Sequence, residues 1–257
     1  MVLREWDALP AFMRVEEVRP YYNVLRKKKT ALRLKRIFDI GMSAVMSVIL
    51  LPVFAVLAVL IAADSRGGVF YRQERVTQYG RKFKILKFRT MTADADKTGP
   101  QITVGKDRRI TGIGGFLRRY RLDELPQLFN ILMGDMTFVG TRPEVPGYVE
   151  RYAPEMRATL LLPAGVTSRA SIHYKEEAML LDGAEDADMV YIRQILPAKM
   201  DYNLESLKKF GLWEELKVLI LTVLAVLGKE KNGSDEMRQG TGKTGKKPGK
   251  KPACKRG

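Results

Sequence analysis

The 257-residue chain has a single cysteine, Cys254, and a single histidine, His173. This scarcity excludes a disulfide framework and a Cys/His zinc site. It also excludes a Ser–His or Cys–His triad built on several candidate residues. Any metal must therefore be held by oxygen ligands. Acidic residues are also few, since 29 Asp and Glu stand against 45 Lys and Arg, which leaves a net charge of +16. That excess favours a polyanionic partner: nucleic acid, anionic lipid or a phosphorylated substrate.

Charge is absent altogether from one stretch, the 24 residues 40–63. A membrane-spanning helix needs about 20 apolar residues, and Pro52 near the middle of the stretch predicts a kink. Seven basic residues precede it between Arg26 and Arg36, and seven follow it between Ser65 and Lys87. Because orientation depends on a difference between the flanks, equal flanks favour a hairpin that enters and leaves the same cytoplasmic face. A spanning helix and a buried core helix are the alternatives.

The rest of the chain has the composition of a folded domain with two unusual ends. Alternating residues predict strands at 69–76 and 82–91, and apolar periodicity predicts two helices within 110–136 and helical structure over 185–210. Residues 92–109 read as a surface loop, and 212–227 as an amphipathic helix on the membrane surface or on the domain. We expect an α/β fold, mostly helical with short strands, in four parts: a basic segment 1–36, a re-entrant helix 37–63 broken at Pro52, a cytoplasmic catalytic domain 64–228, and a disordered basic tail 229–257.

Two adjacent carboxylates, Asp123 and Glu124, lie beside three arginines in the run RRYRLDELP (118–126). One interpretation is that they cap a helix, because acidic residues stabilise helix N-termini. The other is chemical: a carboxylate is a covalent nucleophile, guanidinium groups bind phosphate, and Mg²⁺ suits a site with oxygen ligands only. Four basic residues in separate segments would then converge on Asp123 to hold a pyrophosphate, although each alone reads equally as a surface charge: Lys87, Arg89, Arg118 and Arg142.

The order of several motifs makes the chain similar to a known family. KRIFDI (35–40), Pro52 in the apolar run, FKILKFRTM (83–91), LDELPQLFNILMGDMTFVG (122–140) and Arg142-Pro143 follow one another at family-like spacing. Together they resemble the bacterial sugar transferases, the monotopic phosphoglycosyl transferases that act on polyprenyl phosphate. The resemblance covers roughly residues 37–228.

The resemblance implies transfer of a sugar-1-phosphate from a UDP-sugar to undecaprenyl phosphate, with release of UMP, at the start of capsule, exopolysaccharide, lipopolysaccharide or other glycoconjugate assembly. The residue matching the family's nucleophile is Asp123, which would form a phosphosugar intermediate and contact Mg²⁺, while Glu124 would assist, for instance with a proton. Further matches surround the phosphates at Lys87, Arg118 and Arg142. The family's apolar helix is re-entrant and broken at a proline matching Pro52. This implies an enzyme of the bacterial inner membrane whose catalytic domain faces the cytoplasm, and leaves a homodimer open.

Some positions depart from the family's pattern. Thr141 replaces the first proline of a common Pro-Arg-Pro, and Leu51 stands where serine commonly precedes the breaking proline. The stretch AGVTSRASIHYK (164–175) differs from the family's usual sequence, and Lys175 falls where arginine is common as a substrate-binding residue. His173 in this stretch is either a pocket residue or a structural one. The identity of the sugar therefore cannot be inferred from better-known members of the family.

A membrane-tethered basic binding or scaffold protein is the alternative function. The basic tail favours a polyanionic partner, but the chain carries no nucleic-acid recognition motif. This alternative also leaves the Asp123-Glu124 pair unexplained. We therefore expect an enzyme rather than a nucleic-acid-binding protein.

Overall fold

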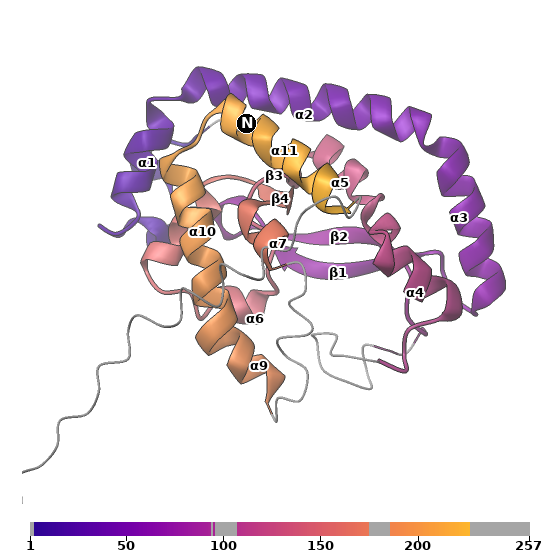
Figure 1. Ribbon diagram of the computed structural model, residues 1–257. Helices are drawn as coiled ribbons and strands as arrows, with labels where there is room; N and C mark the ends of the chain where they lie inside the picture. The colour runs from indigo at the N-terminus through magenta and orange to yellow at the C-terminus, as the bar shows by residue number, and fades with distance from the viewer. Residues whose placement is uncertain (1–2, 94, 96–106, 175–185, 227–257) are drawn as a thin grey trace, which may run out of the picture.

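The computed structural model describes residues 3–93, 95, 107–174 and 186–226. The expectation of a mostly helical α/β protein with short strands is confirmed (Figure 1). The helices are α1 (Arg19–Arg26), α2 (Lys29–Ile49), α3 (Leu51–Asp64), α4 (Gly112–Arg119), α5 (Gln127–Met133), α6 (Pro146–Val149), α7 (Arg169–His173), α9 (Ala187–Val190), α10 (Leu196–Lys208) and α11 (Leu212–Val226). Short 3₁₀ segments are η1 (Trp6–Ala8), η2 (Ala11–Met13), η3 (Gln78–Gly80), η5 (Leu122–Glu124) and η6 (Glu155–Leu161), and η7 (Tyr191–Ile195) is a π-helical turn that joins α9 to α10.

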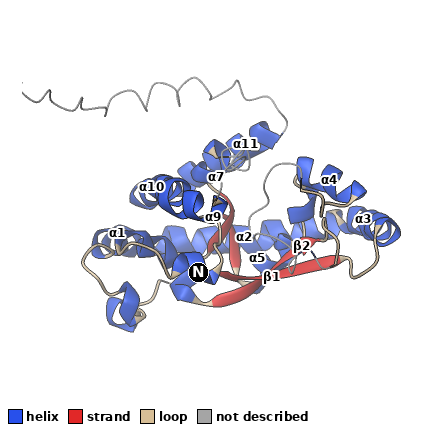
Figure 2. Cartoon of the chain, turned by 90° about the horizontal axis from the view of Figure 1, so that it is seen from below, coloured by secondary structure: helices blue, strands red, loops and turns tan. Residues whose placement is uncertain are grey.

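Two small sheets complete the fold. Strands β1 (Phe70–Val76) and β2 (Lys82–Phe88) form the predicted antiparallel hairpin, and η3 makes the turn between them. Strands β3 (Met136–Val139) and β4 (Ala164–Thr167) pair in parallel, with Thr137 opposite Gly165. Figure 2 shows the β1–β2 hairpin running from the region of α1 and α10 toward α3 and α4.

The apolar run, residues 40–63, extends over the second half of α2 and nearly all of α3, which form a bent helix pair. Helix α2 begins at Lys29, eight residues before the predicted start at 37, and ends just before Pro52, so that α3 leaves at 61°. The kink expected at Pro52 is thus confirmed. No single described helix has both the length and the apolar composition to cross a membrane, whereas α2 and α3 together meet that test as a bent pair. In Figure 1 the pair forms an outer bracket along the top and right side of the molecule.

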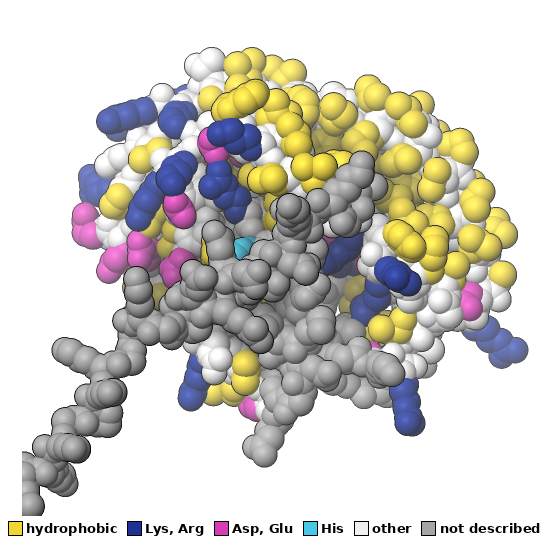
Figure 3. Space-filling model, viewed as in Figure 1, with side chains coloured by type: hydrophobic (Ala, Val, Ile, Leu, Met, Phe, Trp, Pro, Cys, Tyr) yellow, Lys and Arg dark blue, Asp and Glu magenta, His cyan; other side chains and the backbone are white. Residues whose placement is uncertain are grey.

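The polarity of α2 is inverted relative to a helix on a water-soluble domain. Its inward face carries a polar residue at every fourth position, and all four are buried: Lys35, Asp39, Ser43 and Ser47. Its outward face exposes large apolar side chains such as Ile37, Val48 and Ile49, each 67% exposed. A soluble helix buries the apolar stripe and exposes the polar one. Figure 3 shows the resulting apolar side chains gathered along the rim formed by α2 and α3.

Two apolar cores hold the described residues together. One lies under α3, where Phe54, Leu57 and Ile61 pack with β2, α4 and α5. The other joins the N-terminal segment, from Leu3 to Leu32, to η6 and α10. The segment predicted only as basic is therefore an integral part of the fold, and the hydroxyl of Tyr21 bonds to Glu155, 134 residues away. The predicted tail lies outside the described residues.

Candidate active site

The β1–β2 hairpin presents Lys87 to the centre of the molecule. Tyr71 lies opposite Lys87 in the register, and directly opposed residues of an antiparallel pair point to the same face. Gln73 and Arg75, two and four residues along β1, share that face. The outer edge of β2 is fixed to α5, because Asn130 accepts from the Leu86 amide at 2.9 Å and donates to the Lys84 carbonyl at 3.0 Å.

The Asp123-Glu124 pair sits on η5, a short 3₁₀ turn between α4 and α5 that is separate from the α-helix that follows. Arg121 precedes this turn with φ +56°, a left-handed conformation that is uncommon for a residue with a side chain. The chain reverses there, so that Asp123 is only 7% exposed. Strained backbone of this kind is concentrated at functional sites.

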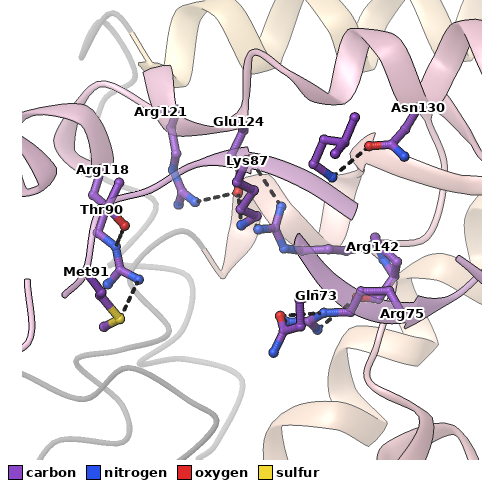
Figure 4. Close-up of polar contacts among 12 residues, drawn as sticks. Gln73, Arg75, Lys87, Thr90, Met91, Arg118, Arg121, Glu124, Asn130 and Arg142 are labelled. Atoms are coloured by element: carbon purple, nitrogen blue, oxygen red, sulfur yellow. Dashed lines mark hydrogen bonds and ion pairs between the residues drawn. The ribbon is translucent and has the colours of Figure 1, made fainter. Parts of the chain in front are cut away.

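The cations around η5 converge on Glu124, whereas the sequence analysis placed them around Asp123. The Lys87 ammonium lies 3.0 Å from Glu124 Oε1. The Arg142 guanidinium donates to both carboxylate oxygens, at 2.5 Å to Oε1 and 3.4 Å to Oε2. Arg121 adds a third cation at 3.9 Å. Figure 4 shows these three side chains directed at Glu124 from three different segments.

The electrostatics of the two neighbouring carboxyls are opposite. Burial alone would raise the pKa of Glu124, but the Arg142 and Lys87 cations outweigh burial and hold that pKa well below its usual range. Burial raises the pKa of the Asp123 carboxyl, and the negative charge of Glu124 adds to the rise against the opposing effect of Lys87. Among the described residues, Asp123 Oδ1 is buried without a hydrogen-bond partner. Glu124 is therefore committed to an ion-pair network, and Asp123 is not.

Asp123 opens onto a cavity of about 550 Å³. The cavity lies between the β1–β2 hairpin, η5, the segment after β3 and the α9–α10 region. Charged side chains predominate in its lining, which includes Arg72, Glu74, Arg75, Lys87, Arg89, Arg109, Arg118, Asp123, Arg142, Glu144 and Lys199. A cavity with this surplus of cations beside one unpaired carboxylate can hold an anion with several charged oxygens.

Of the four predicted phosphate-binding residues, three surround the carboxylates and one does not. Lys87 and Arg142 contact Glu124, and Arg118, which lines the same cavity as Asp123, donates from Nε to the Thr90 hydroxyl at 3.0 Å. Arg89 is buried and its guanidinium binds the carbonyls at the end of α3, including that of Ser65 at 2.6 Å. Although Arg89 lines the cavity, its hydrogen bonds stabilise the end of the bent helix pair.

Two further residues were singled out in the sequence, Lys175 and His173. Lys175 falls outside the described residues. His173 lies at the end of α7, where its ring is 4.8 Å from that of Tyr202 and 5.5 Å from that of Tyr174. Within the part of the chain that the structure describes, His173 is not among the residues that line the cavity. Its observed role is aromatic packing.

Several residues at or beside the cavity were not predicted as site residues. Arg121 was one of the three arginines in the run at 118–121, but nothing in the sequence indicated its left-handed backbone. Arg75 was counted only as part of a basic flank, and its side chain donates to the Pro143 carbonyl at 3.1 Å. Glu144, Tyr191 and Lys199 form a buried cluster, in which Tyr191 and Lys199 lie on the continuous η7–α10 helix and Glu144 comes from the segment after β3. The contact between Glu144 and Tyr191 spans 47 residues, and a contact at that separation leaves no periodic signal in the sequence.

The fit of a metal ion can be judged from the donors at Asp123. No group of three or more His, Cys, Asp or Glu side chains occurs among residues 3–93, 95, 107–174 and 186–226 in an arrangement that could hold a metal. Mg²⁺ does not require one, since it is commonly bound by one or two carboxylates, substrate phosphates and water. Asp123 has a buried carboxylate oxygen that accepts no hydrogen bond from the described residues. Its carboxylate therefore suits the role of the single protein ligand of Mg²⁺.

Comparison with known proteins agrees with this geometry. Residues 30–229 match the family described as bacterial sugar transferase, and the chain belongs to that family. The predicted class of enzyme, a phosphoglycosyl transferase, is thereby confirmed.

Three relatives illustrate the family. A Bacillus subtilis (strain 168) protein is 43% identical over 54% of this chain and 79% of its own length, and carries the provisional name undecaprenyl-phosphate N-acetylgalactosaminyl 1-phosphate transferase. An Aeromonas hydrophila UDP-N-acetylgalactosamine-undecaprenyl-phosphate N-acetylgalactosaminephosphotransferase is 32% identical over 73% of this chain. A Klebsiella pneumoniae UDP-glucose:undecaprenyl-phosphate glucose-1-phosphate transferase is 32% identical over 74%. The chain spans 43% and 39% of the length of the last two.

Proposed function

We propose that this protein transfers a sugar-1-phosphate from a UDP-sugar to undecaprenyl phosphate through a covalent intermediate on Asp123, and that it releases UMP. The observation that carries the proposal is the buried carboxylate of Asp123, unpaired beside a cation-lined cavity, while its neighbour Glu124 takes up the nearby cations. The names of the relatives, which specify UDP-sugar donors and undecaprenyl phosphate, support the same substrates.

The reaction proceeds in two displacements. In the first, an Asp123 carboxylate oxygen bonds to the phosphorus that carries the sugar, the bond from that phosphorus to the bridging oxygen breaks, and UMP leaves with that oxygen. In the second, a phosphate oxygen of undecaprenyl phosphate attacks the same phosphorus and the Asp123–phosphorus bond breaks. The product is a polyprenyl-diphosphate-sugar. Covalent catalysis of this type predicts ping-pong kinetics.

The basic residues stabilise charge during both displacements. Lys87, Arg142 and Arg118 line the same cavity as Asp123, with Lys87 and Arg142 bound to Glu124 and Arg118 bound to Thr90. Donors fixed before the reaction stabilise developing charge because they need little reorganisation. Asp123 would be the protein ligand of Mg²⁺, and the ion, when bound, would supply further neutralisation of charge on the phosphoryl oxygens.

Glu124 acts as a positioning residue rather than a general base. An efficient base has a pKa near the working pH, and the Arg142 and Lys87 cations keep the pKa of Glu124 far below it. Neither displacement written above requires a proton transfer to a protein group. The contribution of Glu124 is therefore to hold Lys87 and Arg142 in place beside the reacting phosphorus.

We further propose that α2 and α3 enter the cytoplasmic membrane as a re-entrant pair, with the catalytic cavity on the cytoplasmic side. The support is the exposed apolar outer face of α2 and α3, the polar inner face of α2, and the 61° bend between the two helices. Helix α11 exposes a comparable set on the same side of the fold, including Trp213 at 66% and Val223 at 57%. An isoprenoid tail stays in the bilayer, since removing it costs about 0.8 kcal/mol per CH₂. A site at the interface avoids that cost.

The test is UMP release from a panel of UDP-sugars by the full chain in membranes supplied with undecaprenyl phosphate. We expect UMP release that depends on the lipid phosphate and disappears in Asp123→Asn. Asp201→Asn, an exposed substitution on α10, is the matched control and should retain activity. Salt-sensitive oligonucleotide binding without UMP release from any donor would instead support the basic binding or scaffold protein.

A further inference from the structure

A second polar cluster lies in the same cavity as Asp123. Glu144 Oε1 accepts a hydrogen bond from the Tyr191 hydroxyl at 2.7 Å and lies 3.6 Å from the Lys199 ammonium. Lys199 also donates to the Tyr191 hydroxyl at 2.9 Å. All three residues line the cavity although each is at most 5% exposed. Taking two charges out of water is costly, and a buried ion pair is weak evidence of a gain in stability. The position of this pair in the cavity wall points to a role in binding.

A short backbone segment connects this cluster to the catalytic carboxylates. Arg142, which binds Glu124, and Glu144 are separated only by Pro143, whose carbonyl accepts from Arg75 at 3.1 Å. The backbone carbonyl of Glu144 accepts from the Val76 amide at 3.0 Å. The segment is therefore fixed along β1. Because Arg142 and Glu144 line the same cavity one residue apart, a ligand bound by Arg142 has Glu144 within its reach.

The two ends of the cavity differ in chemistry. Figure 4 places Arg118, Thr90 and Met91 on one side of the Lys87–Glu124 pair, and Gln73 and Arg75 on the other. On the second side the cavity wall adds Glu144, Lys199 and two tyrosines, Tyr148 and Tyr191, whose rings are 5.1 Å apart. The Glu144 carboxylate repels a phosphate, so this end is unsuited to the diphosphate itself.

The groups at the second end suit a neutral, hydroxyl-rich ring. A carboxylate accepts from hydroxyls, and the amide of Gln73, the ammonium of Lys199 and the guanidinium of Arg75 can donate to ring and hydroxyl oxygens. Aromatic faces beside a few placed polar groups are the usual make-up of a small-molecule pocket. We propose that Glu144, Tyr191 and Lys199 form the subsite for the sugar of the donor, with Glu144 as the specificity-determining residue. This inference rests on the proposed function.

The test compares donors that differ only in the configuration of one sugar hydroxyl, such as UDP-glucose with UDP-galactose and the corresponding pair of N-acetylated sugars. For the full chain with undecaprenyl phosphate, we measure kcat/KM for each donor and inhibition by UMP, which has no sugar. In Glu144→Gln we expect the preference between epimers to fall at least about tenfold, since one hydrogen bond to a charged group is lost. The inhibition constant of UMP should change less than about twofold by the same reasoning.

Glu150→Gln is the matched control, because Glu150 is exposed and lies at the end of α6. This variant should leave both quantities unchanged. If Glu144→Gln does not fold, the double variant Glu144→Gln with Lys199→Met removes both charges of the buried pair together, which proteins tolerate better than losing one partner. Its preference between epimers should fall in the same way.

Three results overturn the inference. An unchanged preference between epimers in folded Glu144→Gln and in the double variant makes the cluster structural. A parallel loss of UMP inhibition and of kcat/KM for every donor assigns this end of the cavity to the nucleotide. Wild-type protein that releases no UMP from any UDP-sugar overturns the proposed function, and the sugar subsite with it, so the two failures are distinct.

Discussion

Arg142 and Glu124 form a two-pronged ion pair, in which the guanidinium donates to both carboxylate oxygens at 2.5 Å and 3.4 Å. The side chains come from the segment after β3 and from η5, so the pair joins two parts of the fold across the cavity. Glu124 reciprocally raises the pKa of Arg142, against the effect of burial. The neighbouring Asp123 carboxyl is left outside this pair, and our proposal assigns the reactive role to it for that reason.

Replacing Glu124 by Gln should destabilise the protein strongly, because Lys87 and Arg142 then lose their counter-charge in a largely buried site. We expect a loss of about 2–4 kcal/mol in the free energy of unfolding, and a fall of roughly 5–15 °C in Tm. Thermal unfolding in detergent measures it. Glu74→Gln is the matched control, because it breaks only an exposed ion pair with Lys82 and should shift Tm by about 1 °C or less.

The pH dependence of this effect has a definite sign. The pKa of Glu124 is lower in the folded protein than in the unfolded chain, so its stabilising contribution is present above the unfolded pKa and is lost as pH falls toward the folded pKa. The difference in Tm between wild type and Glu124→Gln should therefore be largest near neutral pH and shrink under acid conditions. A difference that grows on acidification would contradict the ion-pair assignment.

The acid limb of the activity profile should report Asp123. The carboxylate must be ionised to attack phosphorus, and burial raises its pKa, so the fall in kcat/KM is expected at higher pH than for an ordinary aspartate. Arg118 favours the ionised form, so Arg118→Gln should move the acid limb to still higher pH. The exposed neighbour variant Arg119→Gln should leave the limb in place. A limb that shifts downward in Arg118→Gln would refute the assignment.

Helices and strands with a local sequence pattern could be predicted from the sequence. Contacts that depend on the direction of a side chain could not. Alternation of apolar and polar residues predicted the strands that form the β1–β2 hairpin, and α4 and α5 are the two helices expected within 110–136, with Gly134 at φ +88° ending α5. The choice between Asp123 and Glu124 as the partner of the cations could not be predicted, because it depends on the left-handed Arg121 and on how a short turn aims two adjacent side chains.

The same reason explains two other differences between prediction and structure. Arg89 fits the phosphate-binding pattern by its position beside β2, but the carbonyls at the end of α3 lie nearer to its guanidinium. The N-terminal segment looked merely basic because its apolar residues are widely spaced, and only folding brings Leu9, Met13 and Tyr21 together against η6 and α10.

Metal removal should abolish turnover. In the proposed mechanism Asp123 supplies a single carboxylate ligand, so we expect Mg²⁺ to be held jointly with the donor phosphates and to exchange readily. Addition of EDTA should stop UMP release, and excess Mg²⁺ should restore it. Full activity after exhaustive chelation would show that the cations of the cavity suffice without a metal.

The re-entrant arrangement predicts that both flanks of the α2–α3 pair face the cytoplasm. Cysteines introduced at the exposed residues Arg33 and Lys82, in a Cys254→Ser background, should react with an impermeant thiol reagent only from the cytoplasmic side. Labelling of the two positions from opposite sides of the membrane would mean that the apolar segment spans the bilayer.

The most direct measurement is capture of the covalent intermediate. The full chain is mixed with a UDP-sugar labelled in the sugar-bearing phosphate, without undecaprenyl phosphate, then digested and analysed by mass spectrometry. We predict one sugar-phosphate adduct, on Asp123, that disappears when the lipid phosphate is added and is absent from Asp123→Asn. An active preparation that carries no adduct at residue 123, or carries it elsewhere, would contradict the account.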